Sequence, residues 1–544
     1  MINLRLLDRL GDWNPQLYRE IKGRLKFRNL AVAGAVSVVT QCLIFLPFYL
    51  QVFSSKNYSN YCLKDKQFQC LVNPAGFVLI DWQDWWLDLF NQLSIIFAFV
   101  LLVGGVHMLI GDVGKEQRRG TLNFIKLSPQ SSENILIGKI LGAPILLYIG
   151  ILLAIPLHLA SAIGAGFPFG LLIGFYLLIG ASCFLLYSTM LLQSFQVGFF
   201  TWPCTFLSLI FISPWLQILQ GVLYAAKRQD IYNSNFQWFY LPIGSNLSLL
   251  MGFLLLNIGF WGYWSWQALN RRFLQPSATL ISKGQSYWLV ACLELCILGF
   301  FLGENLNSVH SNDYWRWFEL IAFVECLNLF CFMYLIGLLS PQRQELQDWA
   351  RYEQLRIKNE KLKVKSASVR SSFSSGIFNP LIQDLIWGEK SPVLVAIALN
   401  LVIKTVIWGG WIIFVIPNVY KIQALIVLIL SANWILICAA IAQQMILMKT
   451  PKRLWWSLIT INGLIVLPPL GFALLGISPN EMPGLWLLSA LPWLGMQYAS
   501  AITIFLSLLG QLSILGLLTL QLTKKLQKAG ESASQSLFSA PPPL

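Results

Sequence analysis

One segment of the chain, residues 111–142, gathers charged side chains and residues that start helices. In order, these residues are Lys115, Glu116, Arg118, Arg119, Gly120, Thr121, Leu122, Ser128, Pro129, Gly138 and Lys139. Gly120 interrupts a helix, Thr121 can cap a new one, and Ser128-Pro129 is a second helix start. The pattern predicts a short amphipathic helix held at the membrane by two longer ones. The plainer interpretation is an ordinary basic loop beside a membrane.

Three charged residues lie inside long apolar stretches: Glu294, Glu325 and Lys404. Charges placed there cost about 2.5–3.5 kcal/mol each unless they are paired or hydrated. They could line a polar pathway for a substrate or protons, or a Glu–Lys pair could serve the structure alone. The sequence leaves both interpretations open.

Asp81, Asp84 and Asp88 form a third group, interspersed with tryptophans. Their spacing of three and four residues places the carboxylates on one helical face. This could be the acidic site of a multispan glycosyltransferase, but an interfacial helix with a tryptophan belt explains the same residues. The three histidines are scattered, so we expect no metal site and no catalytic residue.

Cys62 and Cys70 share one segment outside the apolar stretches and could form a disulfide with each other. Such a bond needs the two side chains in a specific geometry. The other eight cysteines lie within apolar stretches, where cysteine commonly serves as a small apolar filler.

The composition identifies the elements that must position these residues. Hydrophobic residues make up 56% of the 544 residues and charged residues 11%, whereas an average globular chain has about 45–50% and 25%. The 62 charged side chains are too few to cover a soluble protein of this size. The sequence therefore predicts an all-α polytopic membrane protein and excludes a globular enzyme.

About 20 apolar residues span a bilayer as a helix, and twelve stretches are about this long when glycine and proline are allowed. They are Leu30–Phe53, Asn91–Ile110, Ile140–Ala162, Phe169–Leu192, Phe199–Leu223, Leu247–Leu269, Tyr287–Leu302, Phe318–Leu339, Val393–Ile416, Ile422–Met448, Leu454–Ile477 and Ala499–Leu522. A further apolar stretch, Leu485–Leu494, is too short to cross and would be interfacial or re-entrant.

The distribution of basic residues predicts how these spans are oriented. With the N-terminus inside, 30 of the 38 Lys and Arg residues lie on the inner side, seven lie outside, and Lys404 lies in a span. Basic residues are retained on the cytoplasmic side, so both termini are predicted to be cytoplasmic. The net charge of +14 therefore reflects topology, and we expect no nucleic-acid partner.

The order of motifs in the loop between spans two and three resembles the signature of ABC-2 type transporter permeases. The matching residues are the run from Lys115 to Leu122, then Leu127-Ser128-Pro129, then Gly138-Lys139. In that family this loop is similar to a coupling helix that docks on the ATP-hydrolysing subunit. The resemblance implies an N-terminal six-helix unit and a coupling role for the loop.

The N-terminal segment resembles the amphipathic elbow helix that precedes the first span in this family. The resemblance rests on Asn14, Pro15, Arg19 and Glu20. Asn14 can cap the helix and Pro15 fits its first position, and the helix would lie in the membrane interface. Residues 379–388 resemble this N-terminal segment more weakly. They begin a second half of the chain, which lacks the Arg-Gly-Thr-Leu motif.

The resemblance implies the permease subunit of an ABC transporter. The chain lacks a G-x-x-x-x-G-K-[ST] phosphate loop, so we expect it to bind no cofactor itself and a separate ATPase subunit to hydrolyse ATP. The absence of a Glu-Ala-Ala importer loop favours export. Membrane lipid and a second permease copy are further expected partners. The expected location is a bacterial-type plasma (inner) membrane. The alternatives are an ion-coupled secondary transporter and a multispan membrane glycosyltransferase.

These observations predict six parts of the chain. They are an elbow helix (1–29), a six-span unit (30–269), a two-span connector (270–340), a charged helix with a Ser-rich linker and second elbow-like helix (341–392), a C-terminal membrane unit (393–522) and a disordered tail (523–544).

Overall fold

The structure is a computed structural model, and it describes residues 4–53, 61–63, 70–72, 78–228, 237–276, 278–302, 313–366, 380–450 and 452–531. Helices make up 83% of it, and these described ranges contain no strand. The chain divides into two units, Met1–Gln275 and Pro276–Leu544. The all-α, membrane-type fold predicted from composition is confirmed.

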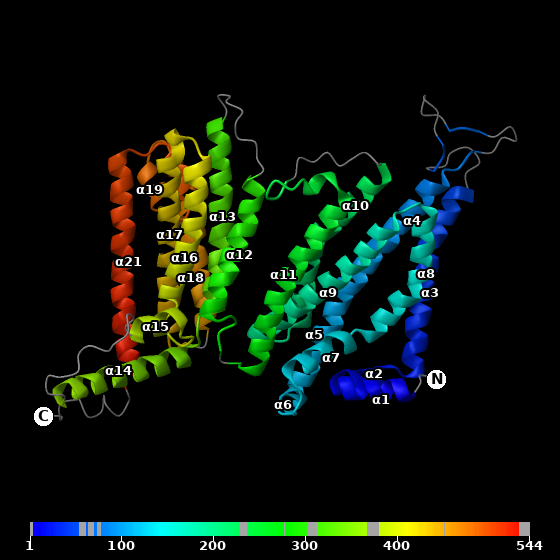
Figure 1. Ribbon diagram of the computed structural model, residues 1–544, viewed down its shortest axis with the longest axis horizontal. Coiled ribbons are helices and arrows are strands. Elements are labelled where there is room, and N and C mark those ends of the chain that lie inside the picture. Colours follow the sequence, from blue (N-terminus) through cyan, green and yellow to red (C-terminus); the bar gives the residue numbers. More distant parts are fainter. Residues whose placement is uncertain are drawn as a thin grey trace. The chain divides into compact units, whose positions relative to one another are not determined.

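The first unit contains the helices that carry the candidate loop and elbow (Figure 1). They are α1 (Leu4–Trp13), α2 (Pro15–Arg24), α3 (Phe27–Phe53), α4 (Trp82–Phe99), η1 (Val100–Gly104), α5 (Gly105–Arg118), α6 (Thr121–Lys126), α7 (Ser132–Gly142), α8 (Ile145–Gly164), α9 (Phe169–Val197), α10 (Thr201–Arg228), η2 (Ile243–Ser245) and α11 (Leu247–Leu274). Within this unit, α1, α2 and α6 lie at the same end of the helix bundle.

The second unit contains the three charged residues predicted to lie inside apolar stretches. Its helices are α12 (Lys283–Leu302), α13 (Asp313–Leu339), α14 (Arg343–Ser366), α15 (Pro380–Trp387), α16 (Leu394–Val415), α17 (Asn418–Ile446), α18 (Arg453–Leu474), α19 (Pro483–Leu487), α20 (Pro492–Met496) and α21 (Ala501–Gly530). The helix predicted in the charged segment is α14, whereas residues 367–379 and 532–544, predicted as linker and tail, lie outside the described residues.

Eleven helices in the described part of the chain are long and apolar enough to cross a membrane. They coincide with eleven of the twelve predicted stretches. The fifth stretch falls in α10. Within this helix, Thr201–Ile210 is the apolar part that the described residues contain, because several later side chains of α10 lie outside the described residues. The apolar stretch predicted as too short to cross, Leu485–Leu494, covers the end of α19 and the start of α20.

The two helices predicted as a connector, α12 and α13, belong to the second unit. The reason is packing, because α12 lies against α16 and α13 lies against α17. The buried side chains of α12, α16 and α17 form one apolar cluster that includes Ile297, Trp408 and Leu428. The division between the two units falls between Gln275 and Pro276, close to the predicted end of the six-span unit at residue 269.

The second predicted span of the first unit is one continuous helical path through α4, η1 and α5. More than half of the most apolar part of this span is buried inside the protein. None of the most apolar part of α3 is buried. Its middle, η1, is a π-helical turn. Tyr187 donates its hydroxyl to the carbonyl oxygen of Leu101 at 2.6 Å, and this oxygen also accepts the backbone N–H of Gly105. Gly105 permits this approach, because a Cβ there would lie 1.8 Å from the Tyr187 hydroxyl.

Candidate functional site

The short helix predicted between two longer ones is α6, and a glycine starts it. Gly120 has φ +75°, a left-handed conformation that glycine adopts without steric cost, and it is the N-cap residue. The prediction that Thr121 caps the helix is wrong, because Thr121 is already its first residue. Its hydroxyl instead donates back to the Glu116 carbonyl oxygen at 3.2 Å.

The second predicted helix start is also displaced along the chain. Helix α7 begins at Ser132, and its N-cap is Ser131, whose hydroxyl accepts the Asn134 N–H. Ser128 does not cap a helix, because its hydroxyl donates to the Ile125 carbonyl oxygen at 2.7 Å and so satisfies the end of α6. Pro129 lies exposed in the connection between the helices.

Helix α6 has one buried and one exposed apolar face. Leu122 and Ile125 are buried and hold the helix against its own unit. Phe124 and Leu127 are 79% and 85% exposed, at the end of the unit where α6 protrudes (Figure 1). Exposed apolar side chains on such a short helix, beside several exposed basic residues, can bind a partner surface. Those basic residues are Lys115, Arg118 and Arg119.

The amphipathic helix predicted at Asn14-Pro15 is α2. Asn14 is fully buried, its Oδ1 accepts the Leu17 N–H at 2.9 Å, and Pro15 occupies the first helical position. The same amide donates from Nδ2 to the Asn134 carbonyl oxygen at 2.8 Å. Asn14 therefore starts α2 and also fixes it to α7.

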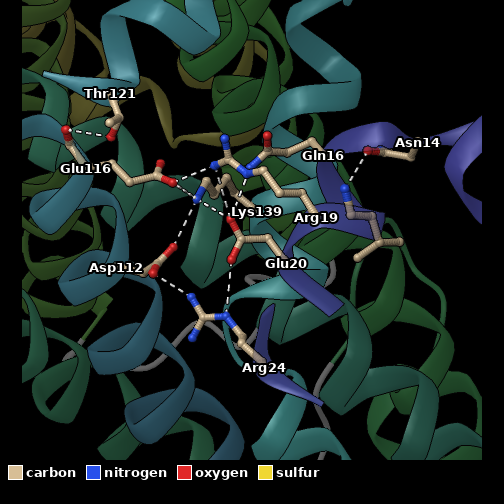
Figure 2. Close-up of polar contacts among 10 residues, drawn as sticks. Asn14, Gln16, Arg19, Glu20, Arg24, Asp112, Glu116, Thr121 and Lys139 are labelled. Carbon is tan, nitrogen blue, oxygen red and sulfur yellow. Dashed lines mark hydrogen bonds and ion pairs between the residues drawn. The ribbon is translucent and has the colours of Figure 1, made fainter. Parts of the chain in front are cut away.

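Lys139 lies at the centre of a cluster of charged side chains from three helices (Figure 2). Its Nζ donates to Glu20 of α2 and to Asp112 Oδ2 of α5, the latter at 3.0 Å, and it lies 2.7 Å from Glu116 Oε1. The Lys139 side chain is 3% exposed, so these carboxylates replace the water that would otherwise solvate it.

Two arginines of α2 complete this charged cluster. Arg24 lies 3.1 Å from Glu20 and 2.5 Å from Asp112, and Arg19 lies 2.6 Å from Glu116. Three cations therefore balance three carboxylates. The three acids each place an oxygen within 4.8 Å of the others, as a metal site would. We assign no metal here, because the lysine and arginines already provide the positive charge.

The structure thus joins residues from two separate predictions, the elbow helix and the loop. Asp112 and Arg24 are members of the charged cluster that the predicted site did not include. A signal for both was present, since Asp112–Glu116 and Glu20–Arg24 are i,i+4 pairs and must share a helical face.

Lys126, at the end of α6, occupies a partly buried position beside aromatic rings. Its Nζ lies 5.2 Å from the ring centre of Phe195 and 4.7 Å from that of Phe273. Burial, and secondarily the positive charge of Arg272, lowers the pKa of Lys126. The contact ties the end of α6 to α9 and α11.

Other predicted residues lie away from this cluster. Cys62 and Cys70 form a disulfide, with Cα atoms 5.4 Å apart. Asp81 is the N-cap of α4 and accepts the N–H groups of Gln83 and Asp84, which gives it a structural role.

The three predicted intramembrane charges lie in the second unit. Lys404 pairs with Glu325 at 2.7 Å, and Glu294 lies buried on α12.

Comparison with known proteins finds no family, no curated protein and no solved structure that matches this chain.

Proposed function

We propose that this chain is the membrane-spanning permease subunit of an ABC transporter, an exporter driven by a separate ATPase that docks on α6. The observation that carries the proposal is the exposed apolar pair Phe124 and Leu127, which lie on α6 and at its C-cap. Two longer helices hold this short helix at one end of the first unit. The resemblance of the loop to the ABC-2 signature identifies the partner class.

The charged cluster supplies a physical route from this docking helix to the spans. Helix α6 is joined directly to α5 through Gly120, and α7 follows it by a short connection. Lys139 of α7 and Glu116 of α5 are ion-paired to each other and to α2. Force applied to α6 by an ATPase would therefore move α5, α7 and α2 together. The chain would bind no nucleotide, and ATP would be hydrolysed by the partner.

Copurification tests the proposal. The double variant Phe124→Asp/Leu127→Asp places two carboxylates on the docking face. We expect the amount of ATP-hydrolysing polypeptide that copurifies with it to fall tenfold or more. Leu63→Asp is the matched control, because Leu63 is an exposed leucine in the disulfide segment, away from α6. Its complex should be unchanged. Retention of the ATPase by the double variant, or its absence from the wild-type complex, would refute the proposal.

A further inference from the structure

The second unit buries three ionisable side chains within its apolar helices. Glu294 on α12, Glu325 on α13 and Lys404 on α16 are each at most 2% exposed. The Lys404 ammonium donates to Glu325 Oε2 at 2.7 Å. The charges of Lys404 and Glu325 balance each other, so Glu294 has no cation of its own in the described part of the chain.

Glu294 has one satisfied oxygen and one unsatisfied oxygen. Its Oε2 accepts the Trp408 indole N–H at 2.7 Å, whereas its Oε1 is buried without a hydrogen-bond partner. An ionised carboxylate in such a position costs several kcal/mol. The Oε1 atom therefore needs either a proton of its own or a hydrogen-bond donor from a neighbouring side chain.

The surroundings of Glu294 offer no second cation among the described residues. The groups that act on it electrostatically are Lys404 of α16, and Glu325 and Cys331 of α13. Lys283 is on the same helix, but its ammonium donates to Leu385, Ser391 and Pro392 near the start of α12. Eleven residues of helix separate Lys283 from Glu294, or about 16 Å.

Asn328 provides a partner suited to a carboxyl group in either protonation state. It is fully buried beside Glu294, to which its side chain can hydrogen-bond, and neither its amide oxygen nor its amide nitrogen has another hydrogen-bond partner. It follows Glu325 by three residues on α13 and therefore shares its helical face. An amide can accept from a carboxylic acid or donate to a carboxylate.

We propose that Glu294 is a reversible proton-binding site of the second unit, with Asn328 as its hydrogen-bond partner in both states. In the protonated state the Glu294 O–H donates to the Asn328 amide oxygen. When the proton leaves, the amide turns and its N–H₂ donates to the carboxylate. Glu325 and Lys404 remain paired throughout and fix the site's other charges. This site is independent of the proposed ATPase docking on α6.

A hydrophobic carbodiimide tests the site, because it modifies protonated carboxyl groups inside membranes. The full-length protein in lipid nanodiscs is treated across a pH series, and modified residues are located by peptide mass spectrometry. We expect Glu294 to be modified and Glu325 to be spared, with modification of Glu294 falling as pH rises. Modification of Glu325 in place of Glu294, or modification of Glu294 that does not change with pH, would overturn the proposal.

Matched variants separate the roles of the three charges. Glu294→Gln should remove the modification. Lys404→Met should leave Glu294 modified and add modification at Glu325, since both acids are then without a cation. Glu325→Gln should suppress modification of Glu294, because the released Lys404 then pairs with it. Continued modification of Glu294 in Glu325→Gln would contradict the charge balance that the proposal rests on.

Infrared spectroscopy covers the case in which the reagent cannot reach the site. A protonated buried carboxylic acid has a carbonyl band that a carboxylate lacks, and we expect this band in the wild type and its loss in Glu294→Gln. Its absence from the wild type would refute the proposal. Protection of Glu294 by added sodium or potassium at fixed pH would also refute it, because the bound species would then be a metal cation.

Discussion

At the scale of single residues, Lys139 is the side chain on which the end of the first unit depends most. It contacts carboxylates from α2 and α5 while lying almost fully buried on α7. An ammonium in such a place is stable only because several acids surround it. Of these acids Glu20 is buried, whereas Asp112 and Glu116 are partly exposed and also pair with arginines.

We expect Lys139→Met to destabilise the protein by about 3 kcal/mol, since it removes the buried member of the ionic group and leaves three carboxylates with only two arginines. Thermal unfolding of the purified protein measures this. Lys115→Met is the control, because Lys115 is exposed, and it should change stability by less than about 0.5 kcal/mol. Equal unfolding temperatures for the two variants would show that the charged cluster contributes nothing to stability.

At the scale of elements, the close approach of α2 to α7 depends on glycine. A Cβ at Gly138 would lie 2.9 Å from the Asn14 Oδ1 and 2.9 Å from Gln16 Cβ. Two helices can come this close only where one of them lacks a side chain. The glycine of the Gly-Lys motif therefore has a packing role, and the lysine beside it has an electrostatic one.

Gly138→Ala should therefore destabilise the protein by about 1–3 kcal/mol through overpacking. Gly180→Ala in α9 is the control, because a Cβ at Gly180 meets no atom within 4 Å. There, alanine should be neutral or stabilise the helix by up to about 1 kcal/mol. Thermal unfolding distinguishes the two outcomes, and a stabilised Gly138→Ala would show that α2 does not lie against α7.

The sequence predicts the local features of these helices better than the contacts between them. The start of α2 follows from Asn14 and Pro15 alone, and apolar length alone identifies eleven spans. The start of α7 lies later than predicted, because Ser128 and Ser131 are equivalent as caps until the path of the chain is known. The cluster around Lys139 joins residues 27 and 119 positions apart, so no local pattern could specify it.

At the scale of the whole molecule, the distribution of basic residues predicts one orientation in the membrane. Fusing alkaline phosphatase or a fluorescent protein to the C-terminus, and separately within the segment between Cys62 and Cys70, tests it. We expect fluorescence only from the C-terminal fusion and phosphatase activity only from the other, because Lys and Arg are retained inside. Phosphatase activity at the C-terminus would reverse the predicted topology and place α14 outside.

The π-helical turn at Val100–Gly104 has a consequence for how this span tolerates changes in length. Such a turn takes up one residue more than an α-helical path requires, without altering the helices on either side. Deleting one residue within the turn should therefore leave Asp112 and Glu116 facing Lys139. A deletion between the turn and Asp112 would instead rotate both acids by about 100° around the helix axis. The direction in which Asp112 and Glu116 face is thus protected from the loss of one residue at the turn, where the hydroxyl of Tyr187 contacts the Leu101 carbonyl.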